Sequence, residues 1–292
     1  MGVHLKRKAK AVALEAASWR VPGGGMVAKS LMNRLKTDFH PPTTAVEYPG
    51  QTRAAACMSI DFDANSPQRK AANHVGTFAL VDLSEKYEIP LTWAICGKDA
   101  EADQDAYQRL KRSTVRPDIG VHTYSHIDVS KSSAEEVEAE VKRCIGTLGL
   151  STAPRTFVFP WNREAHFPVI AKLGFTSYRA KQRAISAPMR SNGMWNIPPV
   201  YYIDQKSIGA GELVNKYLDL CVRYRSVFHL WTHPWGLVED GTAAAMVRTT
   251  LEPVFSHMKD LREAGLLSTT TMADIAACSS ESELNPVIPA NA

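Results

Sequence analysis

The chain has 292 residues, of which 45% are hydrophobic and 22% are charged, and these values are close to the averages of soluble globular proteins. They exclude a disordered chain, a collagen-like repeat and a small disulfide-stapled scaffold, and no apolar run reaches the roughly 18 residues of a membrane-spanning helix. The net charge of +4 is unevenly divided, with +7 in residues 1–36 and −3 in the remainder, so the body of the chain is not a basic nucleic-acid-binding surface.

Residues 1–36 combine eight Lys or Arg residues with one acidic residue, Glu15, which interrupts a short apolar stretch. This is not the pattern of a secretory signal. The five cysteines are scattered without a C-x-x-C pair, so neither a thiolate zinc site nor a disulfide framework is expected. We therefore expect a cytoplasmic protein. Its basic segment forms either a solvated helix beside the body or a peripheral contact with the anionic cytoplasmic face of a membrane.

From about residue 54 onward, short apolar runs typical of buried strands alternate with helical patterns. The strands are expected at 55–60, 91–97, 118–122, 156–160 and 226–232, and the helices around 75–83, 132–148, 164–173, 212–223 and 243–264. Strands separated by helices pair in parallel, because a tight turn cannot join parallel strands. The sequence therefore predicts a βα-repeated sheet or barrel, with the proline-rich stretch 180–211 left unassigned.

Polar side chains gather where the predicted strands end. Asp61 and Asp63 follow the first strand, His122 and His126 follow the third, and His233 follows the strand at 226–232. The carboxyl ends of parallel strands meet on one face, and a carboxylate with two imidazoles can hold a catalytic divalent metal that keeps open positions. Each segment alone is also compatible with a simple turn or a core histidine, but together they predict a metal site.

The order of five segments resembles the polysaccharide deacetylases, also called the NodB-homology or carbohydrate esterase family 4. The segments are SIDFD, IGVHTYSH, FVFPWN, FHLWTHP and LREAGLLSTTTMADIA. The likeness covers about residues 54–276, and HTYSH after IGV is its most specific part. It implies an α/β fold, a distorted (β/α)7 barrel of the polysaccharide deacetylase type. We expect a basic N-terminal extension over 1–50, the barrel over 51–280 and a poorly ordered tail over 281–292.

The resemblance also implies roles for five residues. Asp61 matches the general base and His233 the general acid, while Asp63, His122 and His126 match the ligands of a divalent metal, which we expect to be zinc. The implied chemistry is hydrolysis of a sugar amide. The metal polarises the carbonyl and activates water, the base takes a proton from that water, and the histidine protonates the departing amine.

Two departures from the family pattern concern the partners of these residues. Val158 stands where the family commonly has an arginine that pairs with the base, so Arg163 or Arg179 is expected to replace it. The acidic residue that orients the acid histidine has no clear match, with Asp204 a weak candidate. Aromatic and proline side chains that could form a sugar platform are Pro160, Trp161, Trp195 and Trp235.

The expected function is metal-dependent removal of an N-acyl group, N-acetyl first, from an amino sugar during intracellular glycan or cell-surface polysaccharide assembly. A nucleotide or a lipid is the expected carrier of that sugar, and no nucleic-acid partner is expected. Three alternatives stay open at this point: deformylation of a lipid-linked formamido sugar, hydrolysis of a non-sugar amide such as allantoin, and a catalytically silent glycan-binding module.

Overall fold

The computed structural model describes residues 38–39 and 46–284. Each predicted strand is present, and the first of them, Ala55–Phe62, is buried along its whole length. This burial fits its nearly continuous apolar run, which is typical of a parallel strand covered on both faces. The strands are β1 (Asp38–Phe39), β2 (Ala55–Phe62), β3 (Thr92–Ile95), β4 (Asp118–Val121), β5 (Thr156–Val158), β6 (Ser177–Arg179), β7 (Ala184–Ile185), β8 (Met189–Ser191), β9 (Met194–Asn196), β10 (Tyr201–Ile203), β11 (Val227–Thr232) and β12 (Ser268–Thr269).

The main sheet has the order β10-β11-β2-β3-β4-β5-β6-β9-β8, and β12 also pairs with β2. Its neighbours are parallel except for the pair β8 and β9. The carboxyl ends of the parallel strands therefore lie together at one end of the sheet. Within the described ranges, no strand pairing joins β10 to β8 or β9, so hydrogen bonds do not close the barrel there. The expected α/β fold with a parallel central sheet is confirmed.

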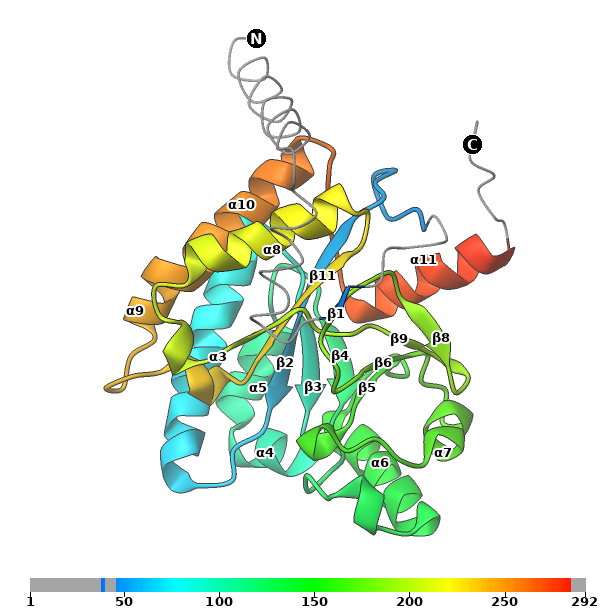
Figure 1. Cartoon of the computed structure of the whole chain (residues 1–292). Coiled ribbons are helices and arrows are strands. Elements are labelled where there is room, and N and C mark those ends of the chain that lie inside the picture. The colour runs from blue at the N-terminus through cyan, green and yellow to red at the C-terminus, as the bar shows by residue number, and fades with distance from the viewer. Residues whose placement is uncertain (1–37, 40–45, 285–292) are drawn as a thin grey trace.

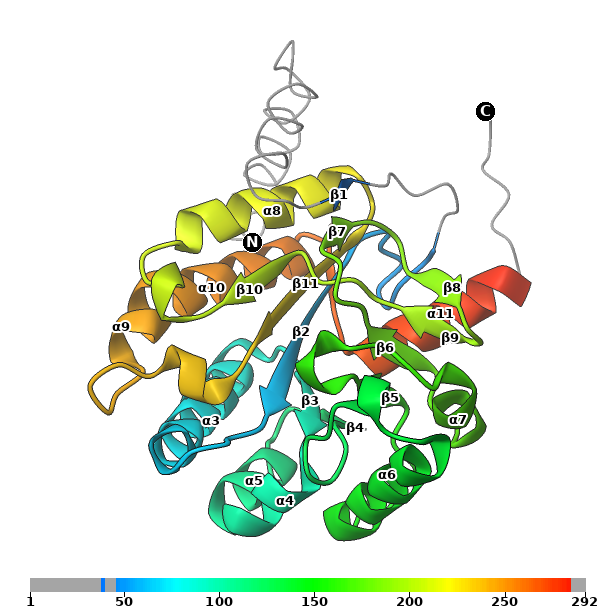
Figure 2. The ribbon, with the colours of Figure 1, turned by 60° about the horizontal axis from the view of Figure 1, so that its bottom comes forward.

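Helices surround the strands, as the ring of α3, α5, α6, α7, α11, α10 and α8 in Figure 2 shows. Figure 1 shows the same arrangement from the side, with α3 in cyan and α6 in green covering different parts of the sheet. The helices are α3 (Pro67–Tyr87), α4 (Gly97–Ala102), α5 (Gln104–Lys111), α6 (Ala134–Leu148), α7 (Phe167–Lys172), α8 (Gly211–Arg223), α9 (Ala244–Met246), α10 (Glu252–Glu263) and α11 (Met272–Leu284). None of these described helices has the apolar length needed to cross a bilayer.

Several elements differ from the sequence-based expectation. The predicted helix 243–264 is divided into α9, a π-helical turn and α10, and the unassigned stretch 180–211 contains the short strands β7 to β10. The tail was expected to be poorly ordered from residue 281, whereas α11 continues to Leu284. Of the expected basic extension over 1–50, residues 1–37 and 40–45 lie outside the described residues, as do residues 285–292.

A close contact between α3 and the turn η4 (Pro234–Leu237) positions the end of β11. A Cβ atom on Gly76 of α3 would lie 2.0 Å from the carbonyl oxygen of Pro234. Only a residue without a side chain allows this approach of backbone to helix. Because Pro234 directly follows His233, the contact fixes the segment that carries the predicted general acid.

Candidate active site

Asp61, on β2, forms a buried ion pair with Arg179, the last residue of β6. One guanidinium nitrogen lies 2.7 Å from Oδ1 and the other 2.6 Å from Oδ2 of Asp61, and both side chains are nearly inaccessible to solvent. Val158 pairs with Arg179 in the register of β5 and β6, so the guanidinium reaches Asp61 from the strand beside Val158. Of the two candidate partners, Arg179 makes the contact, while Arg163 pairs with Asp128 near the surface.

Asp63, His122 and His126 form the cluster that could hold a metal ion. Their ligand atoms all lie within 4.8 Å of one another, with Oδ2 of Asp63 at 3.5 Å from Nε2 of His122 and 3.2 Å from Nε2 of His126. Nδ1 of His122 donates to the carbonyl oxygen of Val158 at 2.7 Å. With Nδ1 committed to Val158, Nε2 is the atom that faces Asp63, and once deprotonated it has the lone pair that a metal-binding histidine requires. The donor set fits a divalent cation.

A tight loop after β4, rather than a helix, brings the two imidazoles together. Thr123 and His126 have left-handed φ angles of 59° and 58°, which are uncommon for residues other than glycine. The ring centres of His122 and His126 consequently lie 4.8 Å apart. Such strained backbone occurs where a site must fix side-chain direction, and here it folds the second ring back toward Asp63.

His233 completes the group. Its Nε2 lies 3.8 Å from Oδ2 of Asp61 and 3.6 Å from Oδ2 of Asp63. Its Nδ1 lies 3.2 Å from the hydroxyl oxygen of Tyr202, on β10. Asp204, the weak candidate for the orienting acid, instead accepts a hydrogen bond from the backbone N–H of Lys206. A phenol therefore occupies the position expected for a carboxylate.

A buried network behind Arg179 supports the ion pair. Arg179 donates to the hydroxyl of Ser59 at 3.0 Å, and Nε2 of His229 lies 2.8 Å from that hydroxyl. Nδ1 of His229 donates to the carbonyl oxygen of Ile197 at 2.9 Å, so Nε2 accepts from Ser59. His229 is thus a core histidine, and its hydrogen bonds support the ion pair of the site.

The charge environment keeps both carboxylates ionised. Burial raises the pKa of Asp61, but the neighbouring Arg179, His122 and His233 outweigh it and hold this pKa below the usual value. Burial likewise raises the pKa of Asp63, and hydrogen bonds from His122 and His126 bring it well below the usual value. Burial also lowers the pKa of His233 more than the two carboxylates raise it. The site therefore presents two carboxylates and a largely neutral imidazole when no metal is bound.

The four residues expected to form a sugar platform occupy different places. Trp161 is 54% exposed, its ring centre lies 4.8 Å from that of His126, and it borders the site. Trp235 donates to Oδ1 of Asp63 at 3.2 Å. Pro160 is buried at the start of a short 3-10 turn. Trp195 is 5% exposed and donates to Ser280 of α11, so it offers no exposed platform.

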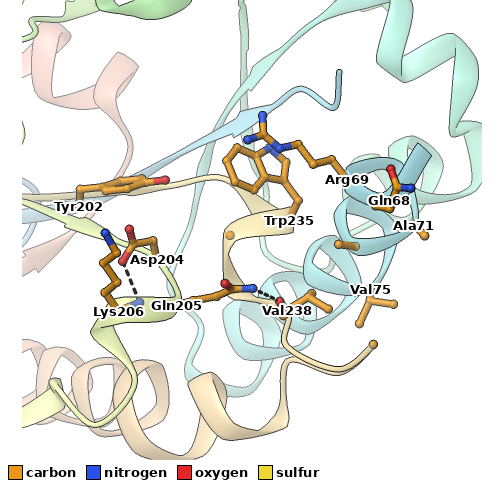
Figure 3. A pocket seen from close by; sticks show the side chains of 13 residues that line it. Gln68, Arg69, Ala71, Val75, Tyr202, Asp204, Gln205, Lys206, Trp235 and Val238 are labelled. Atoms are coloured by element: carbon orange, nitrogen blue, oxygen red, sulfur yellow. Dashed lines mark hydrogen bonds between the residues drawn. The ribbon is translucent and has the colours of Figure 1, made fainter. Parts of the chain in front are cut away.

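A cavity of about 810 Å³ opens beside these residues. Figure 3 shows Trp235 and Arg69 on one side of it, with Tyr202, Asp204 and Lys206 on the other. Tyr202 and Trp235 belong both to the cavity wall and to the contacts of His233 and Asp63 described above. The cavity is therefore continuous with the group of catalytic candidates.

Sequence reasoning missed Tyr202 and Ser59. An acidic residue is the expected partner of His233, whereas a tyrosine hydroxyl can occupy the same position at Nδ1. Ser59 lies two residues before Asp61 in a strand, and residues at this spacing share one face. That spacing is a signal that could have placed its hydroxyl beside the ion pair.

Comparisons with known proteins agree with this fold. Residues 50–166 match the family model described as polysaccharide deacetylase. A structure named as a polysaccharide deacetylase from Mycobacterium smegmatis is 18% identical, with a TM-score of 0.67, and the match covers 86% of this chain and 98% of that one. A second, from Pseudomonas aeruginosa PAO1, is 14% identical with a TM-score of 0.62 and covers 83% and 95%.

A structure named PuuE allantoinase is also similar, at 14% identity and a TM-score of 0.59, covering 83% of this chain and 94% of that one. No curated protein matches the chain significantly. At these identities the solved structures establish the fold alone, and the family model adds the motifs of the first half of the barrel. Over residues 50–166 the chain thus matches the polysaccharide deacetylase family, and its fold is that of solved structures named as polysaccharide deacetylases.

Proposed function

We propose that this protein is a metal-dependent hydrolase that removes an N-acyl group, N-acetyl first, from an amino sugar. One observation carries the proposal. Three kinds of group lie close together at the carboxyl end of the sheet: an arginine-paired carboxylate, a cluster of one carboxylate and two imidazoles, and a third imidazole. Nε2 of this third imidazole, His233, lies 3.8 Å from Asp61 and 3.6 Å from Asp63. Amide hydrolysis requires a base, an electrophile and an acid in this proximity.

Asp63, His122 and His126 would hold the divalent metal, and zinc suits two imidazoles and a carboxylate. When bound, such an ion supplies a Lewis acid that polarises the amide carbonyl and lowers the pKa of coordinated water. Because three protein ligands leave open coordination positions, the site has room for water and substrate. The hydrogen bond of His122 to Val158 fixes the ring in the orientation that the ion needs.

Asp61 is the proposed general base. The two hydrogen bonds from Arg179 fix the plane of its carboxylate and keep it ionised at neutral pH. It does not need to release Arg179 to work, because a carboxylate has about four lone-pair positions and Arg179 uses only two of them. Asp61 can therefore accept the proton of the attacking water.

His233 is the proposed general acid. Its Nε2 faces both carboxylates, and its Nδ1 is held by Tyr202. Burial raises the pKa of Tyr202 to about 12, so the phenol keeps its proton and can donate to Nδ1 of the neutral ring. Once the ring takes up a second proton, Nδ1–H can instead donate to the phenol oxygen, and the imidazolium then presents Nε2–H to the departing amine.

The proposal is tested by measuring the release of acetate or formate from a panel of N-acetyl and N-formyl amino sugars. Allantoin is included in the panel because the PuuE structure shares this fold. We expect acetate release, and Asp61→Asn should lower kcat by about two to four orders of magnitude, since the amide cannot take the water proton. Asp105→Asn, on the surface of α5, is the matched control with unchanged turnover. Hydrolysis of allantoin alone would mean that the substrate is this non-sugar amide and not an amino sugar. No hydrolysis of any compound would favour the catalytically silent glycan-binding module.

The cytoplasmic setting, with a peripheral membrane contact through residues 1–36, is part of this proposal. It rests on the +7 charge of that segment, which would attract it to anionic lipids with about 1 kcal/mol for each basic residue near the surface. Sedimentation with anionic vesicles at low and high salt tests it by comparing the full chain with a chain that starts near residue 37. Equal sedimentation of the two would remove the membrane contact from the proposal.

A further inference from the structure

The cavity beside the active site has walls from two separate parts of the chain. The first turns of α3 contribute Arg69 and neighbouring small residues, and the segment after β10 contributes Asp204 and Lys206 (Figure 3). At about 810 Å³, the cavity lies in the size range of small-molecule sites. It is thus large enough for a sugar together with a substituent on that sugar.

Two residues connect this cavity to the proposed reaction. The hydroxyl of Tyr202 contacts Nδ1 of His233, and the indole nitrogen of Trp235 donates to Oδ1 of Asp63. A molecule that fills the cavity therefore touches the side chains that hold the acid and a metal ligand. Part of a substrate whose amide lies at these groups would extend into the cavity.

The cavity wall carries an excess of positive charge. The guanidinium carbon of Arg69 lies 4.0 Å from the ring centre of Trp235, and Nη1 of Arg69 donates to Asn65 at 3.0 Å, so this cation is held in the wall. Lys206 lines the opposite side. Asp204 is the single acidic residue among the lining residues, and it accepts a hydrogen bond from the backbone of Lys206.

The amino-terminal end of α3 adds to this positive charge. The first turn of this 21-residue helix contains no acidic residue but contains Arg69 and Lys70. Basic side chains are unfavourable at this end, where the helix dipole is positive and acidic residues stabilise the helix. The position of Arg69 in the cavity wall favours a role in binding an anion, because the dipole and this side chain then attract the same group.

We infer that this cavity binds an anionic group, a phosphate or a carboxylate, carried by the amino-sugar substrate, with Arg69 and Lys206 as the residues that select it. The inference deepens the proposed function and rests on it. A planar guanidinium can contact two oxygens of either group, and an ammonium can share an oxygen of a carboxylate or contact a third oxygen of a phosphate. Neutral polymers of N-acetylglucosamine lack the group that these cations recognise.

Kinetics with three probes test the inference: N-acetylglucosamine, N-acetylmuramic acid with its carboxylate, and N-acetylglucosamine 1-phosphate. We expect a lower KM for an anionic probe than for the neutral one, and the better of the two anions identifies the group. Arg69→Gln and Lys206→Gln should each raise KM for that probe about tenfold, the effect of one charge-assisted contact, with kcat unchanged. KM for N-acetylglucosamine should not change in either variant.

The exposed residues Arg116 and Lys216 lie outside the cavity lining and provide the control variants Arg116→Gln and Lys216→Gln. These should leave KM unchanged for all three probes. Equal KM values for neutral and anionic probes, or equal effects of the cavity and control variants, would overturn the inference while leaving the proposed hydrolysis intact.

Binding of the deacylated sugars tests the anion-binding cavity independently of the proposed hydrolysis. Glucosamine and glucosamine 1-phosphate cannot be turned over, and calorimetric titration of the metal-loaded protein measures their affinity directly. Tighter binding of the phosphate sugar, lost in Lys206→Gln and kept in Lys216→Gln, supports the cavity even if no acylated sugar is hydrolysed. Equal binding of both sugars contradicts it.

Discussion

Arg179 and Asp61 form the contact on which the proposed base depends most. Replacing Arg179 with Lys keeps a positive charge but loses the paired hydrogen bonds and the contact with Ser59. We expect kcat to fall by about 10-fold to 100-fold, the usual effect of removing an orienting partner. The pKa of Asp61 should rise as the cation weakens, so the acidic limb of the pH–rate profile should move to higher pH.

Arg163→Lys is the matched control for this change, because Arg163 pairs with the more distant Asp128. Its kcat and pH profile should equal those of the unchanged protein. If Arg163→Lys lowered kcat as much as Arg179→Lys, the assignment of Arg179 as the partner of the base would be wrong.

Tyr202 is a positioning residue for His233. Tyr202→Phe keeps the ring and the cavity wall but removes the hydroxyl that contacts Nδ1. We expect kcat to fall about tenfold, the value of one hydrogen bond, with KM nearly unchanged. Tyr201→Phe, at the neighbouring position of the same strand, should change neither constant. A rise in KM without a loss in kcat would instead make Tyr202 a substrate contact only.

The sequence identified the residue types of the site but not all of their partners. Asp61, Asp63, His122, His126 and His233 could be predicted because each follows a strand whose carboxyl end had to lie on the same face. The choice between Arg163 and Arg179 depends on the parallel pairing of β5 with β6, which places Arg179 beside Val158. That register is a tertiary property, and no local pattern encodes it.

Helix α3 packs directly against the backbone of Pro234, so a change in this helix can move the neighbouring His233. Gly76→Ala would place a methyl group against the backbone of Pro234, and this overpacking should lower the free energy of unfolding by about 1–3 kcal/mol. It should also lower kcat, because Pro234 would shift together with His233. Urea unfolding and acetate release measure the two effects.

Gly146→Ala, in α6, is the control for the glycine change itself. A Cβ at this position meets no atom within 4 Å, so the variant should be more stable by about 0.5–1 kcal/mol through its helix propensity, with unchanged turnover. A Gly76→Ala variant that gained stability in the same way would contradict the packing argument.

Element prediction succeeded where periodicity and capping agreed. The predicted helix around 132–148 is α6, in which Ser133 and Glu136 form a reciprocal capping box and the apolar face is buried. The strands β7 to β10 were not assigned because each has only two or three residues, which is too short for a recognisable alternation. The connection after β3 folds into α4 and α5, where no strong apolar stripe had marked a helix.

For the whole molecule, the buried His229 links stability to pH. Burial is the main reason that its pKa falls from 6.5 to about 3, so the folded protein excludes a proton that the unfolded chain binds. Between these values the free energy of unfolding should therefore decrease as pH falls, by about 1.4 kcal/mol per pH unit from this residue. Stability from this residue is fully present above about pH 6.5.

Urea unfolding of the protein and of His229→Gln at several values between about pH 4.5 and 6.5 measures this effect. Glutamine can keep both hydrogen bonds of His229, and it does not titrate. The slope of the free energy of unfolding against pH should differ between the two proteins by the amount that corresponds to one bound proton. Parallel slopes would mean that His229 becomes protonated in the folded protein.

The proposal that amide hydrolysis depends on a metal at Asp63, His122 and His126 is tested most directly by zinc titration of the metal-stripped protein. The readout is acetate release from an N-acetylated amino sugar. We expect no release without metal, then release that rises in proportion to bound zinc and stops at a single equivalent per chain. His126→Gln should lose most of both the zinc and the release, because it removes one ligand of the cluster. Full acetate release by the metal-free protein, or by His126→Gln without bound zinc, would contradict the account.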